Sequence, residues 1–169
     1  MEFSTKRTHV RPMTNGDAAD VYRYASDPAV TEAAGWAAHT SPEQSAQIVA
    51  EWVTDGDHFA IVWQETGRVI GHIAVYPDSE EGREDTRELG FVLAAAYHRR
   101  GIMTEVVEKT LDTLLAAGVK NVWACCFQGN TASQKLIEKC GFAFRQEGEF
   151  YSDTLDKDFS SLEYCKTQE

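Results

Sequence analysis

The chain has 169 residues, of which 43% are hydrophobic, and it carries a formal net charge of −11 at pH 7. A chain of this size can bury a core of its own, and no linker, repeat or low-complexity stretch divides it, so we expect one domain over residues 1–169. The negative charge would repel phosphate and argues against nucleic acid as a partner, whereas it suits a cationic acceptor such as an amine.

Local patterns argue against a membrane protein and against a metal site. The longest uninterrupted apolar run, 91–97, is far below the ~20 residues that span a bilayer, and residues 1–7 lack the apolar stretch of a secretory signal. The cysteines show neither metal-ligand spacing nor a disulfide framework; they are Cys125, Cys126, Cys140 and Cys165. We therefore expect a cytoplasmic protein without a metal, whose thiols are buried and reduced.

The first half of the chain predicts three strands and two helices. Residues 8–12 form a short predicted strand, and Asn15 is expected to cap a helix. Ser41-Pro42-Glu43-Gln44 combines an N-cap, a proline in the first turn and a capping-box glutamine, and this second helix ends near Gly56. Residues 59–64 and 69–76 are two strands joined by a turn.

Two segments of this half have no regular periodicity. Residues 27–40 hold Trp36, which we interpret as a packing residue, and His39, which we expect at the surface. Residues 78–85 are rich in carboxylates and are interpreted as a solvated hairpin tip.

A basic turn, His98-Arg99-Arg100-Gly101, lies between an apolar run and a strongly periodic helix. Cations at a helix start are normally unfavourable, because the free N–H groups there carry partial positive charge. A bound polyanion such as a pyrophosphate would reverse this penalty and would use the N–H groups as well. A solvated pair of arginines is the alternative.

The helix after the basic turn buries a stripe at three-and-four spacing and is stopped by Gly118. Residues 119–127 alternate and predict a strand, so the segment forms a β-α-β unit with the turn at the carboxyl end of its first strand. Ligands of α/β proteins usually bind at that end. A further helix follows, with Asn130 as its N-cap and Gly141 as its stop.

These two segments together resemble the GNAT acetyltransferase superfamily, which binds acetyl-coenzyme A. The family's phosphate-binding pattern, Gln/Arg-x-x-Gly-x-Gly/Ala, is filled by residues 98–103, with His98 and Met103 as departures. The continuation into Thr104-Glu105, the Asn130-x-x-Ser133 spacing and the strand Arg87–Phe91 are similar to the RimJ/RimL-like branch, which acetylates the N-termini of ribosomal proteins. The resemblance covers nearly the whole chain in order.

The resemblance implies an α+β fold of the GNAT type. It has a mixed, mostly antiparallel central sheet of about seven strands, flanked by about four helices, with a β-α-β core that binds the cofactor. By analogy, residues 27–40 help to form the acceptor side, so Trp36 and His39 are candidate substrate contacts. The implied cofactor contacts are Phe91, Val92, Leu93, His98, Arg99, Arg100, Gly101, Ile102, Met103, Thr104 and Asn130.

The implied chemistry is transfer of an acetyl group to an amine. An α-amino group has a pKa near ~8, so a base must accept its proton, and the position of Glu88 resembles that of the catalytic glutamate in related acetyltransferases. The backbone N–H groups of Phe91 to Leu93 would polarise the thioester carbonyl. In the RimL-like branch a serine at the position of Ser133 protonates the leaving thiolate. The alternative is that Glu88 is a surface carboxylate at a strand end and that the Ser133 hydroxyl caps the helix.

Three functions are compatible with these patterns. The favoured one is an acetyl-CoA-dependent N-acetyltransferase that acts on the N-terminal α-amino group of a protein. The second is an acetyltransferase of a small amine, such as a polyamine, an amino acid or an aminoglycoside, and the third is a noncatalytic acyl-CoA-binding module. The terminal strands, 142–147 and 158–166, pair within or between subunits, so by analogy a homodimer is an open alternative to a monomer.

Overall fold

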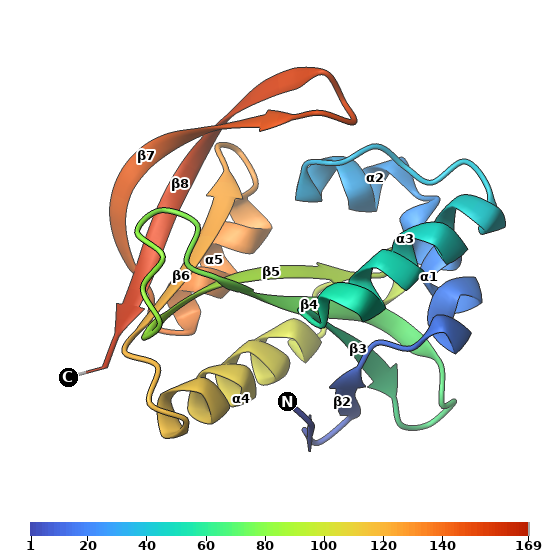
Figure 1. The fold of residues 1–169 in the computed structure, drawn as a ribbon, viewed down its shortest axis with the longest axis horizontal. Coiled ribbons are helices and arrows are strands. Elements are labelled where there is room, and N and C mark those ends of the chain that lie inside the picture. The colour runs from blue at the N-terminus through green and yellow to red at the C-terminus, as the bar shows by residue number, and fades with distance from the viewer. Residues whose placement is uncertain (169) are drawn as a thin grey trace.

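The computed structural model describes residues 1–168, and its centre is an eight-stranded sheet (Figure 1). The strand order is β1-β2-β3-β4-β5-β6-β8-β7, and only the β5–β6 pair is parallel. The strands are β1 Phe3–Ser4, β2 Thr8–Pro12, β3 His58–Trp63, β4 Val69–Pro77, β5 Thr86–Leu93, β6 Asn121–Phe127, β7 Ala143–Ser152 and β8 Lys157–Thr167.

Five α-helices and three 3-10 turns accompany the sheet in the part of the chain that the structure describes. The helices are α1 Ala18–Ala25, α2 Pro28–Thr31, α3 Pro42–Asp55, α4 Ile102–Ala116 and α5 Thr131–Lys139. The 3-10 turns are η1 Asn15–Asp17, η2 Glu32–Ala34 and η3 Ala95–Tyr97. The predicted α+β class and the mixed sheet are confirmed. The described residues form one strand and one α-helix more than the approximate counts that the resemblance implied, and the short β1 and α2 are the elements that the sequence did not indicate.

The helix ends follow local chemistry. Ser41 Oγ accepts from the N–H of Gln44 at the start of α3, and the helix ends at Gly56, whose φ is 76°. At the first helical segment the prediction of an Asn15 cap was wrong. Thr14 is the N-cap of η1, and its hydroxyl and N–H both donate to the Asp17 carboxylate. α1 then continues from η1.

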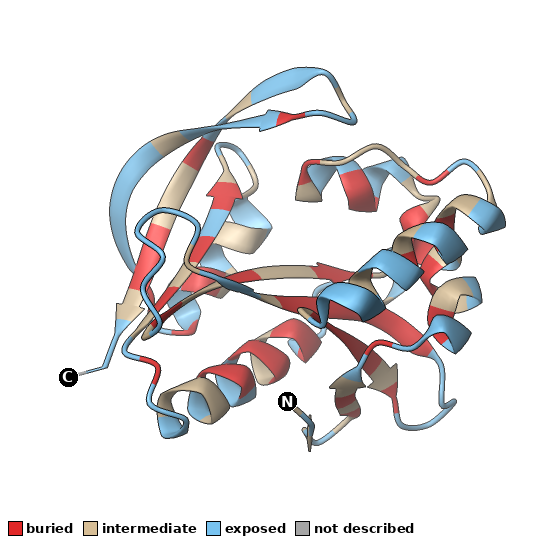
Figure 2. Ribbon diagram, in the orientation of Figure 1, coloured by how far each residue is buried: buried red, intermediate tan, exposed pale blue. Residues whose placement is uncertain are grey.

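Apolar side chains pack on both faces of the sheet. Under α4 and α5 the core includes Ile73, Leu89, Val106 and Ile137, and on the opposite face Val21, Val49 and Val92 pack together with α1 and α3. Figure 2 shows the buried residues concentrated in the central strands and on the inner side of α4, whereas β7 is largely exposed. The half of the sheet formed by β6, β8 and β7 is therefore less covered than the half under α1 and α3.

The last two strands pair with each other within the chain and form a long hairpin that arches above α2 (Figure 1). One bond links this hairpin to the segment after η2, where Ala37 N–H donates to Thr154 Oγ1 over 2.9 Å. None of the described helices is long and apolar enough to cross a membrane.

Candidate active site

The parallel strands β5 and β6 separate partway along their length. Their pairing runs from Thr86 with Asn121 to Leu89 with Ala124, although β5 continues to Leu93 and β6 to Phe127. Beyond Leu89 the edge of β5 that faces β6 therefore has no strand beside it, and a gap opens in the sheet.

The backbone of β5 presents free donors to this gap. Ala94 N–H donates to Ile70 O on the β4 side over 2.8 Å. Groups alternate between the two edges of an antiparallel strand, so the N–H groups of Phe91 and Leu93 point to the other edge, toward the gap. Two unpaired N–H groups at this position form a site for a carbonyl oxygen that gains negative charge.

The turn between β5 and α4 has the geometry of an anion-binding loop. His98 Nε2 donates to the carbonyl oxygen of Leu93 over 2.7 Å, which folds the turn back onto the end of β5. Arg99 and Gly101 have φ values of 57° and 71°, whereas Arg100 between them has a negative φ. When left-handed and right-handed backbone conformations alternate in successive residues, their N–H groups point to the same side. They then form a concave site that binds anions. The free N–H groups of the first turn of α4 follow directly.

The two arginines of the turn have different surroundings. Arg99 lines the cleft described below. The Arg100 guanidinium lies 5.1 Å from the centroid of the Trp63 ring and 5.5 Å from that of Tyr97, which are cation–π distances. The phosphate role of these arginines stays a prediction, and the geometry favours Arg99 for it.

A cleft of about 700 Å³ extends from the gap in the sheet along the starts of α4 and α5. Of the predicted cofactor residues, all except Arg100 line it, and so does Ser133. Its lining from β5 to α4 is Phe91, Val92, Leu93, Tyr97, His98, Arg99, Gly101, Ile102, Met103 and Thr104. Met103, which replaces the small residue of the family pattern, lines the cleft and also packs in the core.

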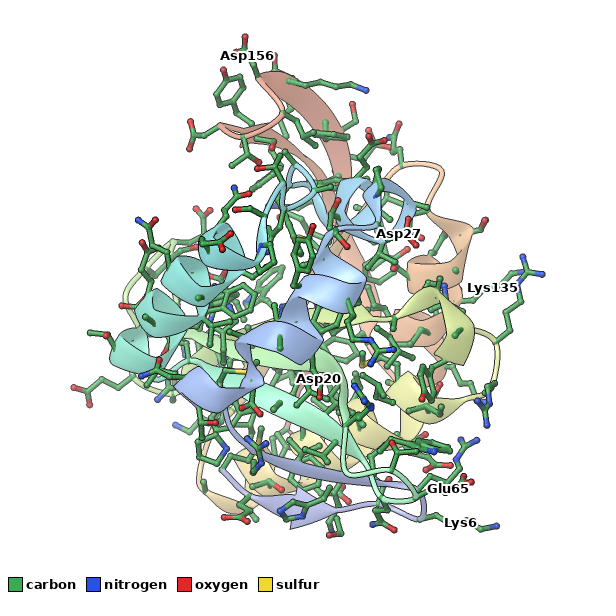
Figure 3. The ribbon with its side chains drawn as sticks, turned by 90° about the vertical axis from the view of Figure 1, so that its right-hand side faces the viewer. Lys6, Asp20, Asp27, Glu65, Lys135 and Asp156 are labelled. Carbon is green, nitrogen blue, oxygen red and sulfur yellow. The ribbon has the colours of Figure 1, made fainter. Side chains whose placement is uncertain are left out.

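Several lining residues were not anticipated from the sequence. One wall comes from α2 and η2, where the segment 27–40 was expected to be irregular; its residues are Ala29, Val30, Ala33 and Ala34. The sequence does contain the start signal of α2, an N-cap followed by a proline: Asp27 Oδ1 accepts from the N–H of Ala29 over 3.0 Å, and Pro28 occupies the first turn. Lys135 and Lys139 of α5 add two cations to the other wall. Figure 3 shows the side of the molecule that carries α2 and α5. Asp27 marks the start of α2 in this view, and Lys135 lies on α5.

Asn130 connects the two walls of the cleft. Its Oδ1 accepts from Ser133 N–H over 3.2 Å and caps α5, and its Nδ2 donates to Ala33 O of η2 over 3.3 Å. Since Asn130 supplies the cap, the Ser133 hydroxyl is not needed for that purpose and is available to a ligand in the cleft.

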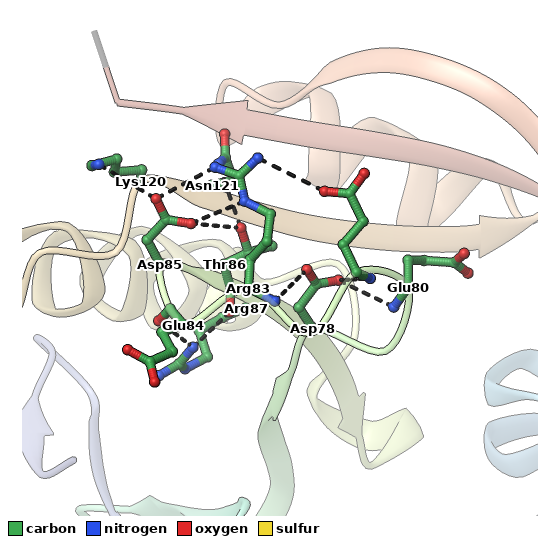
Figure 4. Close-up of polar contacts among 10 residues, drawn as sticks. Asp78, Glu80, Arg83, Glu84, Asp85, Thr86, Arg87, Lys120 and Asn121 are labelled. Atoms are coloured by element: carbon green, nitrogen blue, oxygen red, sulfur yellow. Dashed lines mark hydrogen bonds and ion pairs between the residues drawn. The ribbon is translucent and has the colours of Figure 1, made fainter.

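Glu88 lies outside this cleft, near the start of β5. Its Oε1 accepts from both the N–H and the hydroxyl of Ser79, each over 2.6 Å. Ser79 belongs to the loop between β4 and β5, which Asp78 and the Arg83–Asp85 ion pair hold together (Figure 4). Ser79 thus fixes one oxygen of the Glu88 carboxylate and leaves Oε2 as an acceptor.

The two candidate substrate contacts of the 27–40 segment also lie outside the cleft. Trp36 packs against the core beneath α1 and α3. His39 is 5% exposed, so the expectation of a surface imidazole was wrong; its Nδ1 lies 2.7 Å from Ser45 Oγ, and its ring packs on Trp36. Burial lowers the pKa of His39.

Two further histidines, His58 of β3 and His72 of β4, are buried against Trp52 of α3. The Trp52 indole stacks on His58 at 4.4 Å, and the Tyr24 hydroxyl donates to His72 Nδ1 over 2.8 Å. Burial lowers the pKa of His58 to about 4 and, with the neighbouring His58, that of His72 to about 3. Both rings are therefore neutral at physiological pH.

The expectation of four buried thiols holds for three of them. All four cysteines are free, but Cys125 is exposed, because it projects from the face of β6 opposite to the one that Ala124 and Cys126 bury in the core. Among residues 1–168, no group of three or more His, Cys, Asp and Glu side chains is placed to hold a metal ion.

A family model described as an acetyltransferase (GNAT) domain matches residues 7–143, which is most of the chain. The chain belongs to the GNAT acetyltransferase family. The chain is 26% identical over 151 residues to the uncharacterized N-acetyltransferase YnaD of Bacillus subtilis, with coverage of 89% of this chain and 86% of that protein. It is therefore an N-acetyltransferase.

Solved structures of GNAT enzymes share this fold. The ribosomal-protein-S5-alanine acetyltransferase of Vibrio fischeri superimposes with a TM-score of 0.76 at 21% identity, over 99% of this chain and 96% of that one. The microcin C7 self-immunity acetyltransferase MccE, solved with acetyl-CoA and AMP, superimposes with a TM-score of 0.82 at 15% identity, over 97% and 94%.

The GNAT fold uses acetyl-CoA, and the cleft of this enzyme fits such a ligand. The anion-binding turn, Arg99 and the two α5 lysines suit a pyrophosphate. The free N–H groups of Phe91 and Leu93 suit the thioester carbonyl oxygen. Bound acetyl-CoA supplies an activated acetyl group and a thiolate leaving group.

Proposed function

We propose that this GNAT enzyme acetylates the N-terminal α-amino group of a protein by direct transfer from acetyl-CoA. The observation that carries the proposal is the open face of the sheet beyond the gap, where Tyr76, Cys125 and Phe150 are exposed. A polypeptide whose first residue reaches the gap can leave across this face, whereas a closed pocket would suit a small amine. The net charge of −11 favours a basic acceptor.

Three groups of the chain act as the base, the oxyanion site and the acid of the reaction. Glu88 Oε2 accepts a proton from the acceptor's ammonium group, directly or through one water, while Ser79 holds Oε1, and the neutral amine then attacks the thioester carbon. The N–H groups of Phe91 and Leu93 stabilise the oxyanion of the tetrahedral intermediate. The Ser133 hydroxyl, in the cleft on the cofactor side, donates a proton to the departing thiolate and regains one, through water, from the second proton that the acetylated nitrogen releases. Base and acid thus lie on opposite sides of the reacting carbon, and no covalent enzyme intermediate is needed.

The test begins with consumption of acetyl-CoA in the presence of N-terminal peptides and, in parallel, polyamines, amino acids and aminoglycosides. The proposal expects turnover with peptides that have a free α-amino group and none with the same peptides after N-terminal blocking. Acetylation of small amines alone would refute it. Binding of acetyl-CoA without turnover on any acceptor would favour the noncatalytic module.

The proposed base has its own test. Glu88→Gln should lower kcat by ~10²-fold with little change in the affinity for acetyl-CoA, and the loss should shrink toward pH 10, where the acceptor is already deprotonated. Ser133→Ala should show no such alkaline recovery, because its proton is needed after the amine has attacked. Glu84→Gln, which removes an exposed carboxylate of the same loop, is the control. Wild-type turnover of Glu88→Gln throughout the pH range would exclude Glu88 as the base.

A further inference from the structure

A second carboxylate lies on the same face of the sheet as Glu88. Glu88 is opposite Trp123 of β6, and Cys125, two residues further along β6, is opposite Glu163 of β8. Residues opposite each other, and every second residue along a strand, project from the same side of a sheet. Glu88, Cys125 and Glu163 therefore share one face, which we call the acceptor face. It is the exposed side of β6, opposite α4 and α5.

The Glu163 carboxylate is held in a defined position on this face. A Cβ atom on Gly148 of β7 would collide with Glu163 Oε1, so the carboxylate occupies space that only a glycine leaves free. Gln146 Nε2 donates to the other oxygen, Oε2, over 2.6 Å. The side chain is half-buried between β6 and β7 and is not a freely moving surface carboxylate.

Neither carboxylate is neutralised by a cation of the protein. Within residues 1–168, no ion pair includes Glu88 or Glu163. Burial raises the pKa of the Cys125 thiol between them, and Glu163 and then Glu88 raise it further, so the negative fields of both carboxylates reach this point. Two half-buried carboxylates without counter-ions form an attractive site for positive charge.

The spacing fits two separate positive groups on one ligand. Glu88 and Glu163 are two strands and two residues apart. With a strand spacing of ~4.8 Å and a rise of ~3.3 Å per residue, their Cα atoms lie roughly 12 Å from each other. A single ammonium group cannot contact both carboxylates at this distance. An N-terminal peptide with its α-amino group at Glu88 can, however, extend an arginine or lysine side chain from its second residue to Glu163.

We propose that Glu163 determines acceptor specificity by binding a cationic side chain next to the amino group that is acetylated. The proposal rests on the proposed function and adds that the preferred protein N-terminus has arginine or lysine at its second position. Glu163 makes no contact with the reacting atoms in this scheme. It should therefore affect the choice of acceptor and leave the chemical step unchanged.

The experiment compares two peptides that differ only in charge at the second position, one with arginine and one with citrulline, its neutral analogue. The wild-type enzyme should acetylate the arginine peptide with a kcat/KM about 5 to 10 times higher, and the preference should weaken at high salt. Glu163→Gln should remove the preference and leave kcat/KM for the citrulline peptide unchanged. Gly148→Ala, which keeps the charge but displaces the carboxylate, should reduce the preference as well.

Glu149→Gln is the matched control, because it removes the same charge from the neighbouring strand on the opposite face. It should keep the preference. Equal rates of the wild-type enzyme on both peptides, or an intact preference in Glu163→Gln, would overturn the assignment of Glu163. If the wild-type enzyme acetylates small amines and neither peptide, the proposed function fails instead. The same comparison between a diamine and a monoamine of equal length then decides the role of Glu163.

Discussion

Acid should destabilise this enzyme in a pH range that two buried imidazoles determine. His58 and His72 are 7% and 5% exposed, and burial lowers their pKa values to about 4 and about 3. In the unfolded chain a histidine titrates near ~6.5. Between these values the unfolded chain binds protons that the folded chain does not. The stabilisation is therefore complete above pH 6.5 and is lost as the pH falls below it.

The size of the effect follows from the unfolded state. At pH 5.5, one unit below the unfolded pKa, each unfolded histidine gains about 1.4 kcal/mol by protonation, while the folded rings stay neutral. The two histidines together should lower the free energy of unfolding by about 3 kcal/mol between pH 7.5 and pH 5.5. His39, whose pKa is also lowered by burial, acts in the same direction. The lowered pKa of Asp17 affects stability only in more acidic solution.

Urea denaturation, followed by tryptophan fluorescence at pH 7.5, 6.5 and 5.5, measures this loss. His72→Asn keeps an acceptor for the Tyr24 hydroxyl. Whatever its free energy of unfolding at pH 7.5, the variant should lose only about half as much of it as the wild type between pH 7.5 and pH 5.5. His9→Gln, at a half-buried histidine beside Glu2, should retain the full loss. A free energy of unfolding that stays constant from pH 7.5 to 5.5, or an unchanged slope in His72→Asn, would refute the reasoning.

Three further variants test the cofactor side and the support of Glu88. Arg99→Glu should weaken acetyl-CoA binding at least tenfold by calorimetry, and Arg100→Glu less, because the Arg100 guanidinium lies over Trp63; equal losses would contradict this difference. Gly101→Val places a branched residue at a φ of 71° and should abolish acetyl-CoA binding while the circular dichroism spectrum is retained. Ser79→Ala removes one of two bonds to Glu88 Oε1 and should lower kcat several-fold at constant KM for acetyl-CoA; unchanged kcat would show that the loop does not position the base.

The elements from the basic turn to α5 could be predicted from the sequence because their signals are local. The helix after the basic turn, its stop at Gly118 and the Asn130 cap each depend on residues within a few positions of one another. The basic turn, the start of α4 and Asn130 line one side of the cleft, whereas the wall from α2 and η2 was not anticipated. The set of predicted cofactor contacts came from the family resemblance and not from local chemistry.

The acceptor half could not be predicted in the same way, since its residues meet only through the sheet. Ser79 reaches Glu88 across a loop, and Glu163 is 75 positions after Glu88 in the sequence. Their shared face depends on the register of β8 with β6, and the β7–β8 pairing is shifted near Arg145. His39 was misassigned for a related reason: besides the Trp36 ring of its own segment, the groups that bury it come from α1 and α3.

Backbone N–H groups and side chains alternate in direction along β5, so the strand cannot gain or lose a residue without consequence. Odd-numbered positions of the strand present backbone N–H groups to the gap at Phe91 and Leu93, while Glu88 and Gly90 project from the acceptor face. Insertion or deletion of one residue between Glu88 and Phe91 would exchange the two sets and separate the proposed base from the proposed oxyanion site in a single step. The 78–85 loop just before β5 carries no such constraint beyond Ser79. Natural length variation should therefore accumulate in this loop and stop at the first residue of the strand.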